Sequence, residues 1–214
     1  MFGWLNPASR VPTDLASVTT IATDTEVDPR AVGVEPAAVE RVWRAVERLY
    51  RTGIHPAIQL CVRCRGQVIL ERAIGHASGN GPDDGDEVPK VRATEKTPFN
   101  IFSASKVLTA MVVHLLDERN LLRLDDPVAE YVPEFARHGK ERITIRHVLT
   151  HRAGMPRIPP EAMQLDNIAN PDRLLRIFVD AEPTSVPGRL LAYHALSGGF
   201  ILAEVVRRIT GKSI

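Results

Sequence analysis

The stretch FNIFSASKVLTA, residues 99–110, combines an apolar approach, a polar motif and the first turns of an apolar helix. Within it, Ser103 and Lys106 form the motif Ser-x-x-Lys (S-x-x-K). Positions three apart share one face of a helix, so the Lys106 amine can lie beside the Ser103 hydroxyl. A serine hydroxyl becomes a nucleophile when a neighbouring base takes its proton. The stretch therefore predicts that Ser103 is a nucleophile at the start of a helix. Ser105 is the weaker candidate, because it is adjacent to Lys106 and not three positions from it.

The same spacing also fits a serine that caps a helix and a lysine on its surface, although a surface cap needs no apolar approach. A second candidate is Tyr193, which lies in residues 187–195 (PGRLLAYHA), between a Pro-Gly loop and a helix. A phenol near a lysinium has a lowered pKa and can accept the serine proton. The alternative is a packing aromatic whose hydroxyl bonds a neighbour, which is how we interpret Tyr50 and Tyr131.

Two histidines four residues apart, His147 and His151, occur in the segment HVLTHRAG. Such a pair could ligate one metal ion, but the glutamate of a zinc-protease motif is missing between them. We therefore predict no metal site and interpret the segment as a packed helix. His194 follows Tyr193 directly and is predicted to contact substrate or to support the site.

The order of elements predicts an α+β protein whose sheet is begun but not completed. Residues 1–35 have no clear period and are predicted to form an irregular arm. An amphipathic helix is predicted over 36–50, followed by a hairpin of strands 57–64 and 67–75 that turns at Arg65-Gly66. Later helices are expected at 103–120, after Thr144, from Asn170-Pro171 and over 196–210.

The helix predicted over residues 103–120 carries apolar side chains at three- and four-residue steps. They are Val107, Leu108, Met111, Val112, Leu115 and Leu116. We expect this stripe to face a core. A two-stranded hairpin is not stable alone, so the chain is interpreted as the N-terminal part of a longer architecture.

Composition excludes several classes of function. The 214 residues carry a formal net charge of +1, which gives no excess charge for binding nucleic acid or an anionic membrane. No run approaches the roughly 18 apolar residues of a membrane helix. Residues 1–10 lack the basic and apolar regions of a secretory signal, so we expect a cytoplasmic protein. Cys61 and Cys64 lie on opposite faces of a predicted strand, and we expect neither a metal site nor a redox site there.

Four segments together resemble the serine β-lactamase and penicillin-binding-protein superfamily, and within it the class C β-lactamase-like esterases known as family VIII carboxylesterases. They are FNIFSASKVLTA (99–110), LLRLDDPVAEYVPEF (121–135), ITIRHVLTHRAGMP (143–156) and PGRLLAYHALSGGFILAEVVRRITGKSI (187–214). The resemblance covers about residues 36–214. It implies an antiparallel sheet flanked by helices, with an all-helical subdomain at about 120–182. This chain would supply that subdomain and the first two strands.

The resemblance also implies an acyl-serine mechanism without a metal or organic cofactor, acting on a small-molecule ester. Ser103 corresponds to the nucleophile, Lys106 to the lysine that assists proton transfer, and Tyr193 to the general base and acid of the Y-x-N motif. Ala195 stands where the lactamases have asparagine, and His194 stands where serine is common. An alanine cannot bond the acylamide group of a β-lactam, which favours plain esters.

The resemblance is incomplete after Tyr193, because no Lys-Thr-Gly or His/Trp-x-Gly motif follows. In the family this motif lies on a later strand and supplies a second oxyanion donor. Losing one such donor typically lowers the rate by a factor on the order of 100 to 1,000. Taken together, the four segments and Ala195 predict a hydrolase of carboxylic esters. The alternatives are a β-lactamase, a D-alanyl-D-alanine peptidase-like enzyme, or an inactive truncated scaffold.

Overall fold

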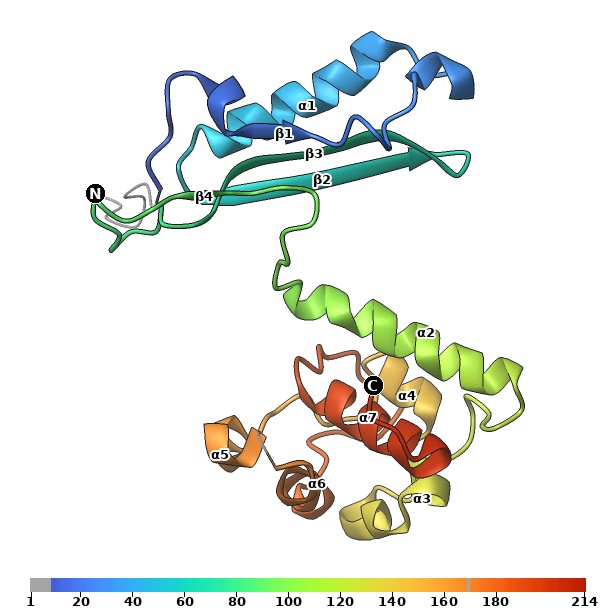
Figure 1. The fold of residues 1–214 in the computed structure, drawn as a ribbon. Coiled ribbons are helices and arrows are strands. Elements are labelled where there is room, and N and C mark those ends of the chain that lie inside the picture. The colour runs from blue at the N-terminus through green and yellow to red at the C-terminus, as the bar shows by residue number, and fades with distance from the viewer. Residues whose placement is uncertain (1–8, 169) are drawn as a thin grey trace. The chain divides into compact units, whose positions relative to one another are not determined.

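The computed structural model describes residues 9–168 and 170–214 and divides into two compact units (Figure 1). The first unit, Met1–Phe99, contains a sheet and one long helix. The second unit, Asn100–Ile214, is helical apart from an isolated β-bridge between Pro127 and Thr144. None of the helices within the described ranges is long and apolar enough to span a membrane.

The sheet of the first unit is antiparallel and is built around its longest strand. Its strands are β1 (Thr19–Ile21), β2 (Ala57–Cys64), β3 (Gln67–Ser78) and β4 (Val91–Arg92). The order is β1-β3-β2, and β4 also pairs with β3. The hairpin turn at Arg65 and Gly66 is confirmed, since both residues have positive φ, as the two central residues of a type I′ turn require. Helix α1 (Pro36–Tyr50) packs Trp43 and Tyr50 against apolar residues of β3.

Residues 9–35 are more regular than predicted, and residues 1–8 of the predicted arm lie outside the described residues. Strand β1 lies within the supposed irregular arm, with Thr19 opposite Ile74 of β3. Short 3₁₀ helices, η1 (Leu15–Val18) and η2 (Pro29–Val32), flank it. The expectation of two strands was therefore wrong, because the sheet has four strands among the described residues. A three-residue strand is too short to show alternation, and its place is set by pairing with β3 rather than by its own pattern.

The second unit consists of short helices whose ends carry the predicted caps. Its elements are η3 (Phe102–Ala104), α2 (Ser105–Glu118), α3 (Val128–Tyr131), η4 (Pro133–Gly139), α4 (Ile145–Leu149), η5 (Pro160–Met163), α5 (Leu165–Ile168), α6 (Pro171–Asp180) and α7 (Ser197–Thr210). Thr144 caps α4 and Asn170 caps α6 through their side-chain oxygens, while Gly211 ends α7 in the left-handed conformation.

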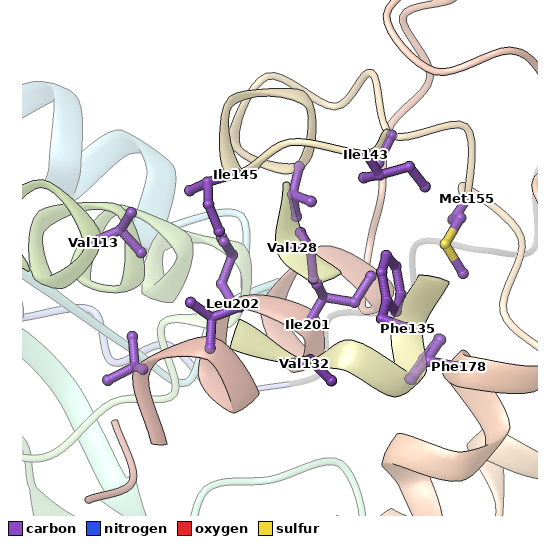
Figure 2. Packing of buried hydrophobic residues seen from close by; sticks show 14 of the residues in the cluster. Val113, Val128, Val132, Phe135, Ile143, Ile145, Met155, Phe178, Ile201 and Leu202 are labelled. Atoms are coloured by element: carbon purple, nitrogen blue, oxygen red, sulfur yellow. The ribbon is translucent and has the colours of Figure 1, made fainter. Parts of the chain in front are cut away.

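One hydrophobic core joins the helices of the second unit, and Figure 2 shows its central side chains. Phe135 and Phe178 are nearly fully buried, and α7 contributes Ile201 and Leu202. Burying each such side chain stabilises the fold by about 1.5–3 kcal/mol. Because α2 and α7 also pack into this core, the helical unit extends beyond the predicted limits of 120–182.

The apolar stripe of α2 faces the core only in part, contrary to expectation. Leu116 is buried, Val112 is half-buried, and Val113, outside the predicted stripe, is fully buried. Four members of the stripe are exposed: Val107, Leu108, Met111 and Leu115. The helix packs on the second unit through the side that carries Val113 and Leu116. The predicted stripe is therefore wider than the face that this unit covers.

Candidate active site

Ser103 lies in η3, immediately before α2, at a turn with unusual backbone geometry. The preceding residue, Phe102, has a φ of 44°, which non-glycine residues rarely adopt. Its N–H donates to the side-chain oxygen of Asn100 at 2.9 Å. Ser103 is exposed, whereas the hydroxyl of Ser105 donates to the Phe102 carbonyl at 2.7 Å. The turn therefore presents the Ser103 hydroxyl and ties back that of Ser105.

The three residues predicted to carry chemistry lie together. The Lys106 Nζ donates to Ser103 Oγ at 3.4 Å, and the Tyr193 Oη donates to the same oxygen at 2.6 Å. Lys106 Nζ also lies 5.3 Å from the centroid of the Tyr193 ring. Ser103 and Tyr193 are 90 positions apart in sequence, so their contact depends on the tertiary packing of the second unit.

These contacts change the acidity of the phenol. The hydrogen bond with Ser103, followed by the bond to Lys106 and its positive charge, lowers the pKa of Tyr193 below its ordinary value near 10. A lower pKa increases the fraction of tyrosinate near neutral pH, and tyrosinate can accept a proton from the serine hydroxyl. The arrangement thus places the Ser103 hydroxyl within hydrogen-bond reach of a phenol whose pKa is lowered.

The loop that carries Tyr193 is bonded to His151 on both sides of the tyrosine. The N–H of Ala192 donates to the backbone oxygen of His151 at 3.0 Å, and the N–H of His194 donates to its Nδ1 at 3.2 Å. The His151 ring lies 4.9 Å from the Tyr193 ring, centroid to centroid. Burial, and then the charge of Lys106, lowers the pKa of His151. Sequence reasoning considered this histidine as a metal ligand and missed its contact with Tyr193.

The structure separates the two roles predicted for His194, contact with substrate and support of the site. Its relative exposure is 0%, so it cannot face a substrate in this structure. Its Nε2 accepts the N–H of Met155 at 2.9 Å, and its Nδ1 lies 2.6 Å from the Ala192 carbonyl. Substrate contact, one of the two roles predicted for His194, is therefore wrong, because the ring is fully buried and its Nε2 bonds the loop after α4. Ala195 is half-buried, and its proposed effect on specificity stays a prediction.

The other histidine considered as a metal ligand, His147, has a structural partner. His147 Nδ1 accepts the N–H of Thr144 at 3.3 Å and closes the capping box of α4. Within residues 9–168 and 170–214, no group of three potential ligands among His, Cys, Asp and Glu could hold a metal ion. Cys61 and Cys64 are free thiols on β2 of the first unit.

The fold agrees with the comparisons to known proteins. The sequence model of the beta-lactamase family matches residues 44–214. The chain belongs to the beta-lactamase family.

Its relatives include esterases. Esterase/beta-lactamase LipL of Mycobacterium tuberculosis is 33% identical over 211 residues, which cover 89% of this chain and 45% of the relative. The crystal structure of a family VIII carboxylesterase superposes with a TM-score of 0.67 at 28% identity, covering 81% of this chain and 45% of that one. EstA from Arthrobacter nitroguajacolicus Rue61a gives a TM-score of 0.68 at 27% identity, covering 91% and 45%. The chain thus spans about half the length of these proteins.

Proposed function

We propose that this chain carries the nucleophilic half of a serine hydrolase that cleaves small-molecule carboxylic esters through an acyl-serine intermediate on Ser103. One observation supports this most directly: Ser103 Oγ lies 2.6 Å from Tyr193 Oη and 3.4 Å from Lys106 Nζ. A nucleophile within hydrogen-bond reach of a base, beside a charge that stabilises the base, is the arrangement that acyl transfer needs.

The proposed reaction uses these side chains and water. Tyrosinate 193 takes the proton of Ser103 as Oγ attacks the ester carbonyl carbon. The tetrahedral intermediate collapses with loss of the alcohol, whose oxygen receives that proton from Tyr193. Water then attacks the acyl-serine, again giving its proton to Tyr193, and the acid leaves as the proton returns to Ser103. Lys106 stabilises the tyrosinate, and the Ser103 backbone N–H is the proposed oxyanion donor.

The choice of esters over β-lactams rests on Ala195 and on the named relatives. A methyl side chain offers no hydrogen bond to the acylamide group of a β-lactam, so a site built this way has lost one basis for selecting that substrate. Two of the three relatives are described as an esterase or a carboxylesterase, and the name of one includes both activities. β-Lactam hydrolysis is the second candidate because of that name.

Covalent labelling with a fluorophosphonate tests the nucleophile without a substrate assumption. The chain is expected to gain a single adduct, mapped to Ser103. The Ser103→Ala variant should gain none. Ser105→Ala is the matched control, since its hydroxyl is two residues away and bonded to Phe102 O. Tyr193→Phe should slow labelling by about 100- to 10,000-fold, because it removes the base. A folded chain that gains no adduct, or gains it at Ser105, would refute the proposal.

Substrate class is tested separately with p-nitrophenyl butyrate and nitrocefin. The ester should be turned over in a Ser103-dependent manner and nitrocefin should not. Nitrocefin turnover that exceeds ester turnover would replace the ester proposal with the lactamase one. Labelling at Ser103 without turnover of either substrate would leave an activated nucleophile and reject hydrolysis by this chain.

A further inference from the structure

We propose that His151 is a positioning residue that holds Tyr193 on Ser103 by bonding the loop on both sides of the tyrosine. The inference rests on the proposed function, because Tyr193 matters as a base only if Ser103 is the nucleophile. It assigns a role to the second histidine of HVLTHRAG, which the proposed reaction leaves unused.

The argument begins with the two hydrogen bonds. The backbone oxygen of His151 accepts from Ala192 N–H, and its ring Nδ1 accepts from His194 N–H. The two donors flank Tyr193, so one residue holds the N–H group of the residue before the tyrosine and that of the residue after it. The loop is thereby tied down on both sides of the tyrosine, and the direction of the phenol is then set by its two side-chain torsions. The tilted ring contact of 4.9 Å restricts those torsions further.

The ring bond requires one protonation state of His151. Nδ1 can accept a proton only when it carries none, so the neutral ring must hold its proton on Nε2. Protonation would turn Nδ1 into a donor facing the His194 N–H and would break the bond. The charged and titratable groups around the ring are Lys106 of α2, Tyr193 and the neutral ring of His194, whose centroid lies 5.9 Å away. The Lys106 charge and burial both favour the neutral ring that the bond needs.

The backbone conformation of His151 limits which substitutions can test its role. Its φ is 58°, in the left-handed region that glycine and asparagine tolerate best. Glycine at this position keeps the backbone conformation and removes the ring. Asparagine keeps the conformation and places an oxygen acceptor two bonds beyond Cβ, as Nδ1 is in histidine. The pair His151→Gly and His151→Asn therefore separates the side-chain bond from the backbone turn.

A matched control is available in the same unit. His138 also has a left-handed φ, 57°. Its side chain pairs with Glu182, whereas that of His151 bonds the residue after Tyr193. His138→Gly makes the same chemical change at the same backbone conformation. It should leave the site unchanged.

The experiment is a titration of isotope-labelled tyrosine Cζ resonances by NMR in the full chain, together with the rate of fluorophosphonate labelling. Of the three tyrosines, Tyr50 and Tyr131 have raised pKa values, so a titration below 10 identifies Tyr193. We expect His151→Gly to raise the Tyr193 pKa toward 10 and to slow labelling by about 100-fold, the effect of a displacement near 1 Å. We expect His151→Asn to restore most of the lowering of the Tyr193 pKa and most of the labelling rate. We expect His138→Gly to match the wild type in both measurements.

The outcomes separate the two proposals. A folded His151→Gly variant with an unchanged Tyr193 pKa and labelling rate would overturn the positioning role while leaving the proposed function intact. A wild-type Tyr193 that titrates at 10, with no adduct on Ser103, would reject the proposed function and the inference with it. If the His151→Gly variant does not fold, the tautomer of the wild-type His151 ring, measured by NMR of its nitrogens, tests the positioning role instead. An Nε2–H tautomer supports the bond, and an Nδ1–H tautomer overturns it.

Discussion

Replacing His194 with alanine should destabilise the second unit rather than weaken substrate binding. The imidazole is fully buried and accepts the N–H of Met155 through Nε2, while Nδ1 bonds the Ala192 carbonyl. Alanine leaves the Met155 N–H without a partner next to the core. It also removes one of the hydrogen bonds that join the loop after α4 to the loop before α7.

The magnitude follows from these contacts. An unsatisfied buried donor costs about 1–3 kcal/mol, and the lost packing of the ring adds to it. We expect the free energy of unfolding to fall by about 2–4 kcal/mol, a sum of the cost of one buried donor and a modest cavity. For a chain of this length each 1 kcal/mol lowers the Tm by about 2–4 °C. The Tm should therefore fall by about 4–16 °C.

Urea unfolding followed by far-ultraviolet circular dichroism measures this change, because most of the described helices belong to the second unit. His114→Ala is the matched control, since His114 is an exposed histidine on α2 and surface substitutions change stability by about 0.5 kcal/mol or less. A loss below about 0.5 kcal/mol at His194, accompanied by a rise in KM for the ester, would refute the reasoning and restore the substrate-contact role.

Three further predictions concern the site and its support. The labelling rate of Ser103 should rise with pH through the Tyr193 pKa, because tyrosinate is the base; Lys106→Met should move that inflection to higher pH, since it removes the charge that lowers this pKa. The labelling rate is measured across pH for both proteins, and an inflection at the same pH in Lys106→Met would contradict this prediction. Phe135→Ala should lower the unfolding free energy by about 3–5 kcal/mol in urea titrations. Gly154→Ala should cost more than about 1–2 kcal/mol, because its φ is 77° and a Cβ would clash with the Ser185 carbonyl oxygen.

The local signals in the sequence predicted local structure well. Thr144, Asn170 and Gly211 mark helix ends in the structure because caps depend on hydrogen bonds within four residues of the chain. The turn at Arg65-Gly66 was predicted for the same reason, since both conformations are set by the turn itself. Ser103 and Lys106 share a face because i and i+3 always do.

The features set by distant contacts were not predictable in this way. His194 was expected to contact substrate or to support the site because it follows Tyr193, but its burial involves Met155, 39 positions away. The exposed side of α2 depends on which helices pack against it, and a stripe of apolar residues does not specify that. The meeting of Tyr193 with Ser103 was expected from the family resemblance, and spacing within either segment could not have predicted it.

The exposed face of α2 has a consequence for the protein in solution. Val107, Leu108, Met111 and Leu115 leave apolar side chains in contact with water along one side of that helix. Contact between such faces is driven by the release of hydration water, so it weakens on cooling and strengthens in sulfate. Concentrated samples of this chain should therefore scatter more light when warmed or salted with sulfate, and Met111→Lys should reduce that scattering by placing a charge in the middle of the face.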